Sequence, residues 1–184
     1  MSTLFSLAEE IRRCTSCPLW KKRTLAVPGD GNSKTKIMFV GEAPGVEEDR
    51  QGLPFVGKSG KFLNEMLNLV DLNRKDLFIT GAVKCRPENN RVPSAKELQT
   101  CKELWLDKQI GLIKPELIVI LGNSALKSLL KKTKLSELHG KIIMGNNQKY
   151  FVTYHPAAGM RFPKIKEEMK KDFLKLKSFV NLLY

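Results

Sequence analysis

The feature that most constrains this chain is a set of four short, largely apolar runs separated by longer stretches with helical periodicity. The runs are residues 36–41 (KIMFVG), 77–83 (LFITGAV), 116–122 (ELIVILG) and 150–154 (YFVTY). Two of them are almost entirely apolar, as expected of strands that are buried on both faces. The alternation of strands and helices therefore predicts an α/β domain with a mostly parallel sheet.

The stretches between the runs carry helix signals. Ser94 followed by Glu97 is a capping-box pattern, in which the two side chains satisfy the first backbone amides of a helix. No repeat, low-complexity tract or long linker interrupts the chain, so residues 1–184 are expected to form a single domain. The expected helices are residues 59–70, 94–113, 123–130 and 169–183.

The charge balance narrows the class of partner. The chain carries 32 Lys and Arg against 19 Asp and Glu, a net charge of +13, which argues against a typical acidic metabolite enzyme and favours nucleic acid. The apolar run at 117–121 is far too short to cross a bilayer. Charges such as Glu9 and Arg12 interrupt the N-terminal segment, so no signal peptide is expected. We therefore expect a cytoplasmic protein with no membrane partner, monomeric by default.

Unusual segments follow the end of each predicted strand. They are GEAPG at 41–45, Gly81 with Cys85 shortly after it, GNS at 122–124 and HPAA at 155–158. In parallel α/β sheets, ligands bind beyond the carboxyl ends of the strands. We therefore expect these segments to share one rim that holds the functional site.

The rim residues are candidates for ligand binding and catalysis, and simpler interpretations of them are also open. GEAPG lets backbone approach a ligand and exposes amides, although a plain turn would look the same. Glu42 is a candidate acid, and Phe55 is either core or a platform for a planar base. His155 stands where a donor would face a developing anion. Residues 159–162 are expected to form a basic, apolar loop tip that can wedge open a base step.

The four cysteines form a second constellation. Cys14 and Cys17 make a C-x-x-C turn, while Cys85 and Cys101 lie far along the chain. In a cytoplasmic protein they are more typical of metal ligands than of disulfides. Spacing does not decide between zinc and an iron–sulfur cluster, but all-thiolate ligation beside prolines favours [4Fe–4S]. Four unrelated buried thiols and a redox-active C-x-x-C pair are the alternatives.

The joint occurrence of GEAPGVEEDRQGLPFVGKSG, ITGAVKCRP, ILGNSAL and TYHPAAGMR with these cysteines resembles the family 4 uracil-DNA glycosylases, iron–sulfur enzymes of thermophilic bacteria and archaea. The resemblance runs from Cys14 to about Leu176. It implies a three-layer α/β/α fold around a central four-stranded parallel sheet. It also implies a base-excision-repair enzyme that removes uracil from single- or double-stranded DNA, leaves an abasic site and has no lyase activity. A sliding clamp is a candidate partner.

The resemblance further assigns roles by position. It implies that Cys14, Cys17, Cys85 and Cys101 hold a [4Fe–4S] cluster. It places Gly41, Glu42, Glu48, Phe55, Gly81 and His155 around the uracil, with Met160 and Arg161 against the DNA. Within this set, Phe55 stacks on the base and Glu48 excludes the methyl group of thymine. Glu42 and His155 are the implied catalytic residues, with His155 bonding uracil O2.

Gly81 departs from the family pattern, which usually has Asn at this position to read the polar edge of uracil. A glycine has no side-chain hydrogen bonds to offer. Backbone or water could replace the amide, another side chain such as Asn89 or Asn123 could supply it, or the base specificity could differ. Three rival functions follow: a glycosylase for another deaminated base, a non-catalytic iron–sulfur nucleic-acid-binding protein, and a phosphate-handling enzyme that uses GEAPG as its anion loop.

Overall fold

The computed structural model describes residues 3–145, 147–181 and 183. Its strands are β1 (Asp30–Gly31), β2 (Ile37–Gly41), β3 (Phe78–Gly81), β4 (Leu117–Leu121), β5 (Lys141–Gly145) and β6 (Gln148–Thr153). Its α-helices are α1 (Leu4–Arg13), α2 (Val46–Gln51), α3 (Lys58–Asn68), α4 (Ala95–Cys101), α5 (Asp107–Ile113), α6 (Asn123–Leu130), α7 (Leu135–Leu138), α8 (Pro156–Arg161) and α9 (Pro163–Val180). None of these described helices has both the length and the apolar character that a bilayer span requires.

The strands form one sheet in the order β1-β3-β2-β4-β6-β5. The four central strands are parallel and coincide with the four predicted runs, which confirms the fold class. The expected strand count is wrong, because antiparallel β1 and β5 extend the two edges. The pattern of the sequence misses them for a physical reason: β1 has only two residues, and β5 is a partly exposed edge strand without a buried face.

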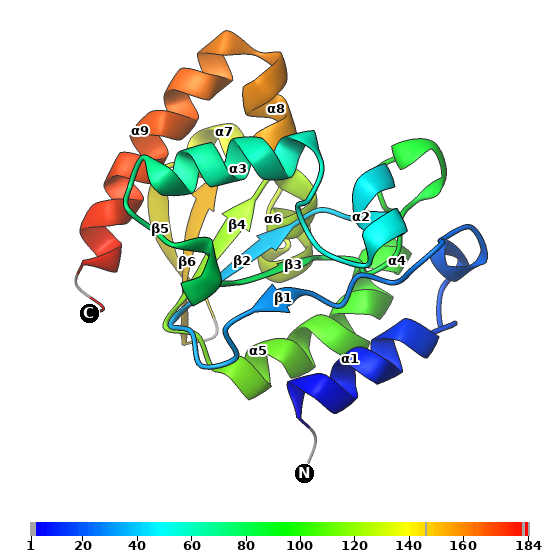
Figure 1. Cartoon of the computed structure of the whole chain (residues 1–184). Coiled ribbons are helices and arrows are strands. Elements are labelled where there is room, and N and C mark those ends of the chain that lie inside the picture. The colour runs from blue at the N-terminus through cyan, green and yellow to red at the C-terminus, as the bar shows by residue number, and fades with distance from the viewer. Residues whose placement is uncertain (1–2, 146, 182, 184) are drawn as a thin grey trace.

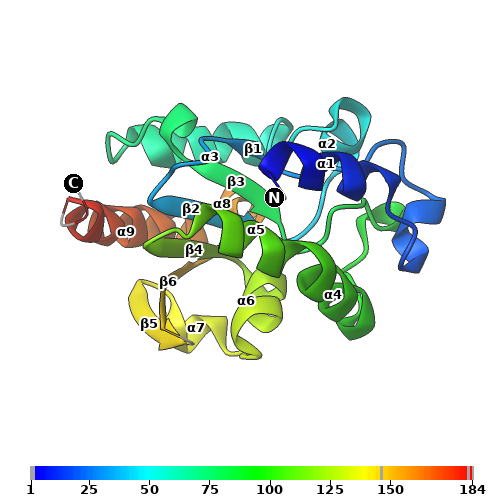
Figure 2. The same ribbon diagram turned by 90° about the horizontal axis from the view of Figure 1, so that it is seen from below.

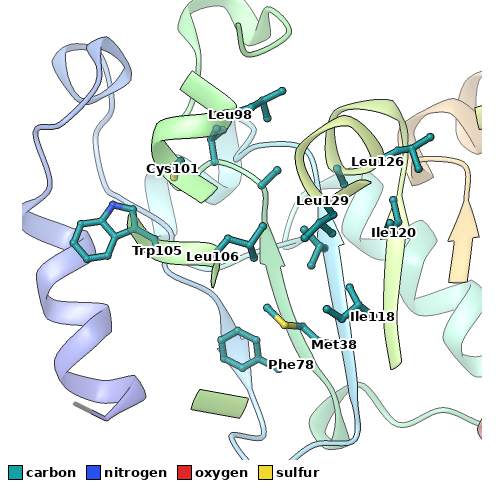
Figure 3. Packing of buried hydrophobic residues seen from close by; sticks show 14 of the residues in the cluster. Met38, Phe78, Leu98, Cys101, Trp105, Leu106, Ile118, Ile120, Leu126 and Leu129 are labelled. Carbon is teal, nitrogen blue, oxygen red and sulfur yellow. The ribbon is translucent and has the colours of Figure 1, made fainter. Parts of the chain in front are cut away.

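The sheet lies between two helical layers, with α3 in front of the strands and α6 behind them (Figures 1 and 2). Side chains alternate across each strand. Met38 and Val40 of β2 face the core formed with α4, α5 and α6, whereas Ile37 and Phe39 face the core formed with α3 and α9. Figure 3 shows Met38 and Ile118 packed with Leu106 and Leu126 in the first core. Burial on both faces explains the continuous apolar runs.

The helices agree with the expected ones in part. Helix α6 coincides with the predicted residues 123–130, and the capping box of Ser94 and Glu97 is confirmed. From Ala95 to Ile113 the helix is continuous, but it widens into a π-helical segment directly after Cys101. Such segments often lie at functional sites. Helix α9 begins at Pro163, earlier than expected, because a proline suits the first turn of a helix.

The strand register brings the predicted rim together. Gly41 at the end of β2 pairs with Gly81 at the end of β3, and Leu121 of β4 pairs with Thr153 of β6. The residues that directly follow these strands therefore emerge at one edge of the sheet.

Candidate active site at the carboxyl edge of the sheet

A pocket of about 270 Å³ opens at this edge. Its wall comes from segments far apart in the chain: the GEAPG loop after β2 with helix α2, the loop before α3 with the first turn of that helix, the segment after β3, and the first residues after β6. The residues that line it include Glu42, Glu48, Phe55, Asn90, Arg91 and His155. The structure thus brings together four of the residues that the sequence selected and adds two that it did not.

Phe55 is held in a strained position at the pocket. Its backbone has a φ of 51°, the left-handed region that few non-glycine residues adopt. A Cβ at position 60 would lie 1.9 Å from the carbonyl oxygen of Phe55, so Gly60 is required there. A Cβ at position 41 would lie 2.5 Å from the Phe55 ring, so Gly41 makes room for it. The ring centroid lies 5.8 Å from that of His155 at an interplanar angle of 32°.

Glu48 organises the two loops around the pocket. The residue is 7% exposed, and its Oε2 accepts a hydrogen bond from the Gly45 amide at 3.1 Å. Its Oε1 accepts from the amides of Val56 and Gly57 at 2.9 and 2.8 Å. The carboxylate therefore ties the GEAPG loop to the segment that carries Phe55. Its predicted contact with C5 of the base stays a prediction.

His155 is fixed as a neutral hydrogen-bond donor. It caps helix α8, where its Nδ1 accepts a hydrogen bond from the Ala157 amide at 3.2 Å, so its proton resides on Nε2. Burial lowers the pKa of His155 to about 4, so the ring is uncharged at neutral pH. Gly122 permits this position, because a Cβ there would lie 2.8 Å from the Cβ of His155.

Glu42 is oriented by a residue that the sequence did not select for the site. The buried Ser124 hydroxyl, in the first turn of α6, donates a hydrogen bond to Oε2 of Glu42. A Ser at the start of a helix usually signals only a cap, so the sequence offered no sign of this longer-range contact.

Arg91 is another residue of this region that the sequence analysis did not select. Its guanidinium forms a bidentate ion pair with the buried Glu97 of α4, with N···O distances of 2.9 and 2.7 Å. This pairing lowers the pKa of Glu97 to about 2. Because Arg91 also lines the pocket, the pair fixes a cation at its mouth. The available signal was an arginine three residues before the capping-box serine, Ser94.

Gly81 lies beside the pocket, at a small adjoining cavity of about 10 Å³. A Cβ at this position would lie 2.7 Å from the carbonyl oxygen of Val83. Of the Asn residues in the described part of the chain, Asn90 lines the pocket, and neither Asn89 nor Asn123 does. The side chain of Asn90 already accepts a hydrogen bond from Nε of Arg86 at 2.8 Å.

Lys84 fixes the backbone of Gly81 through a hydrogen bond from a buried side chain. It is 1% exposed, and its Nζ donates to the Gly81 carbonyl, the Thr80 hydroxyl and Oε1 of Gln109 at 2.8, 2.6 and 2.7 Å. Burial lowers the pKa of Lys84 to about 8. The sequence analysis did not select this lysine, although a charge at the end of an apolar run was the signal.

Met160 and Arg161 occupy a different structure from the expected loop tip. They form the end of helix α8, because His155 caps this helix and Pro156 suits its first position. Met160 is 45% exposed and Phe162 is 49% exposed, and Arg161 lies over the Phe162 ring. The apolar and basic side chains remain available at the surface.

The four cysteines converge although they come from distant segments. Cys85 and Cys101 are buried, and Cys14 and Cys17 pack against the same core. Burial raises the pKa of Cys17, Cys85 and Cys101, to about 12 for Cys101, and neighbouring cysteines add to each of these shifts. The four thiols are therefore electrostatic neighbours, and all are free.

Two N–H groups point at these sulfur atoms. Arg23 donates to Sγ of Cys85 at 3.0 Å, and the Trp105 indole donates to Sγ of Cys14 at 3.2 Å. Hydrogen bonds to ligating sulfur are typical of iron–sulfur sites. Among the residues that the structure describes, no group of three or more His, Cys, Asp or Glu side chains is already placed to hold a metal ion. The soft, all-thiolate donor set fits a cluster.

The chain is similar to known proteins along most of its length. A profile of the Uracil DNA glycosylase superfamily matches residues 28–177. A type-4 uracil-DNA glycosylase of Saccharolobus solfataricus is 44% identical, over 96% of this chain and 86% of that protein. Type-4 uracil-DNA glycosylases of Archaeoglobus fulgidus and Thermotoga maritima are 42% and 40% identical, over 96% and 95% of this chain and 92% and 93% of theirs. The profile match includes every pocket residue named above.

Proposed function

The chain belongs to the uracil-DNA glycosylase superfamily and is a uracil-DNA glycosylase of DNA repair, and we propose that the pocket at the carboxyl edge of its sheet is where uracil is cut from the sugar. One observation carries this assignment: a neutral His155 shares the pocket with the Phe55 ring. Its Nε2 lies 3.7 Å from where a Cβ of Gly41 would be, beside that ring. A stacking surface and a preorganised donor are what excision of a planar base requires.

Access to the base comes first. Uracil in duplex DNA is stacked, so the nucleotide is extruded into the pocket at a cost of a few kcal/mol. The net charge of +13 provides affinity for phosphates that is independent of sequence. Arg91 at the pocket mouth pairs with a backbone phosphate, and Met160 and Arg161 on the exposed end of α8 contact the position that the base has left.

The chemistry follows from where charge develops. As the bond between C1′ and N1 breaks, its electron pair goes to the base and the sugar becomes oxocarbenium-like. The Nε2 proton of His155 stabilises the negative charge on uracil O2, and a neutral histidine does this without acting as a general acid. Water then adds to C1′ and gives up one proton, which balances the charge of the departing uracil anion. Glu42, held by Ser124, stabilises the positive sugar or positions that water.

We assign Cys14, Cys17, Cys85 and Cys101 as ligands of a [4Fe–4S] cluster. When bound, the cluster supplies a structural link and no redox step. The residues of the chain then tie helix α1 and the turn after it to the middle of the chain. Arg23 and Trp105 stabilise the thiolate form through their N–H···S hydrogen bonds.

The test is excision from a labelled oligonucleotide that contains one uracil, in the presence of chelator, with alkali to reveal abasic sites. Cleavage at the uracil alone, and only after alkali, is expected. Matched oligonucleotides with thymine, cytosine or hypoxanthine at the same position are expected to stay intact. His155→Ala is expected to bind the uracil oligonucleotide but not to cut it.

Two results would contradict the proposal. Cleavage at hypoxanthine in preference to uracil would move the specificity to another deaminated base. Full activity of His155→Ala would remove the donor from the mechanism.

A further inference from the structure

A second pocket, of about 390 Å³, lies between α4 and the far half of α6, and its lining shares no residue with the pocket at the rim. Its lining divides into two chemical parts. Ala95 and Leu98 of α4 give it an apolar side. Lys127 and Ser128 of α6, with Lys131 directly after this helix, give it a polar, basic side.

Ser128 is an unusual buried group. The residue is 7% exposed, and its hydroxyl is the one buried side-chain polar atom without a hydrogen-bond partner in the described part of the chain. Such a group destabilises a protein unless something satisfies it, so it is rarely left in place. Ser128 lines the pocket, but its hydroxyl oxygen is buried, so a ligand there bonds the hydroxyl only after the side chain rotates toward the pocket.

The lysines are equally unengaged. Lys127 and Lys131 stand one helical turn apart and, within the described residues, make no ion pair or side-chain hydrogen bond. The third lysine of the pocket, Lys102, is bonded to both carboxylate oxygens of Asp107. The acid Glu103 accepts a hydrogen bond from Gln99. Two free cations therefore remain beside an apolar surface.

We propose that this pocket binds one nucleotide of a DNA strand whose uracil lies in the first pocket. The phosphate pairs with Lys127 and Lys131, and the base packs against Ala95 and Leu98. The Ser128 hydroxyl, turned toward the pocket by rotation of its side chain, bonds a polar edge of the base. The inference rests on the proposed function. A single nucleotide suits the volume of this pocket, which is in the range typical of small-molecule sites.

The chain itself connects the two pockets. Arg91 lines the first pocket and Ala95 lines the second, so their Cα atoms lie within about 14 Å. The ion pair of Arg91 with Glu97 fixes the segment between them. A strand that leaves the first pocket at Arg91 can follow this segment to the second.

The experiment compares two substrates, a uracil-centred trinucleotide and a long single strand with central uracil. The double variant Lys127→Ala/Lys131→Ala is expected to lose about tenfold in kcat/KM on the long strand through a higher KM. On the trinucleotide it should match the wild type. The slope of log kcat/KM against log salt should flatten by about 0.7, as expected when one phosphate contact of a single strand is lost.

The matched control is Lys171→Ala/Lys175→Ala, which removes the same charge at the same spacing from α9, a helix that lines neither pocket. Ser128→Ala is expected to weaken use of the long strand three- to fivefold without lowering Tm, because it deletes a hydroxyl that the protein leaves unsatisfied.

Equal losses from the two double variants, a loss that extends to the trinucleotide, or an unchanged Ser128→Ala variant would overturn the second site. Failure of the wild type to cut either substrate would instead contradict the proposed function.

Discussion

The pocket at the rim and the cysteine region are both assembled from segments far apart in the sequence, but they differ in what holds them. In the pocket, the chain satisfies its own polar groups. Glu48 has three amide donors, Nδ1 of His155 has the Ala157 amide, and Arg91 has Glu97. In the cysteine region, burial raises the pKa of three of the thiols.

This difference shows which interactions stabilise each of the two regions. The pocket is preorganised by backbone hydrogen bonds, so it is complete before substrate arrives and spends no reorganisation energy during the reaction. The cysteine region places ionisable sulfur in an environment that disfavours thiolate, and a bound metal group would reverse this. Substitutions in the first region should therefore affect catalysis, and those in the second should affect folding.

The largest effect is expected from Cys101→Ser. Loss of a structural metal group removes folding free energy directly, so the free energy of unfolding should fall by more than about 3 kcal/mol. Urea unfolding together with iron and sulfide content measures this. A variant that keeps wild-type stability while lacking iron would show that the two regions do not differ in the way described.

The next effect is that of His155→Ala, which should lower kcat about 100- to 1,000-fold and cost about 1 kcal/mol of stability through the lost cap of α8. His155→Gln, which retains an N–H donor, should recover part of the rate. Because burial lowers the pKa of His155 to about 4, the wild-type rate should not fall as pH drops through 6.5. Single-turnover rates across this range test it, and a transition near 6.5 would mean that the histidine is solvated.

Glu48→Gln should weaken both catalysis and stability, by about 2 kcal/mol in the free energy of unfolding. The amide that replaces the carboxylate brings an N–H₂ group against backbone donors that need an acceptor. Chemical unfolding and excision kinetics measure the two effects. Glu47→Gln, at the neighbouring and more exposed carboxylate, is the matched control and should change neither.

The lowered pKa of Glu97 predicts that the stability of the protein depends on pH. Its folded pKa of about 2 lies below the ordinary value of 4.5, so its contribution is present above pH 4.5 and is lost as pH falls toward 2. We expect about 2 kcal/mol, reduced from the full shift because Arg91 is half-exposed. Unfolding at about pH 5 and about pH 3 should show a smaller difference in Glu97→Gln than in the wild type.

The smallest effect is expected at Gly81. In Gly81→Asn a Cβ would press on the Val83 carbonyl, so stability should fall by about 1 kcal/mol and activity on uracil should not rise. Gly81→Ala isolates this backbone conflict from the amide. If Gly81→Asn accelerates uracil excision while Gly81→Ala does not, the strand end adapts and the family's usual residue works in this chain.

The sequence predicted the central sheet and the rim correctly because both depend on local patterns. Continuous apolar runs indicate strands buried on both faces, and parallel strands align their carboxyl ends. The strand pattern could therefore place Glu42 and His155 at one rim, and the family resemblance added Glu48 and Phe55, which line the same pocket. The edge strands and the short helix α8 were missed, because two-residue and six-residue elements carry too little periodicity.

By itself, the sequence determined the class of fold and the edge of the sheet where the pocket lies, and it selected four of the residues that line this pocket. Tertiary structure decided the rest: the ion pair of Arg91 with Glu97, the three acceptors around Lys84, and the unsatisfied hydroxyl of Ser128. Hydrophobic periodicity in a sequence indicates which positions are buried. It does not indicate the partner of a buried polar group, because that partner depends on which distant segments meet and at what distance.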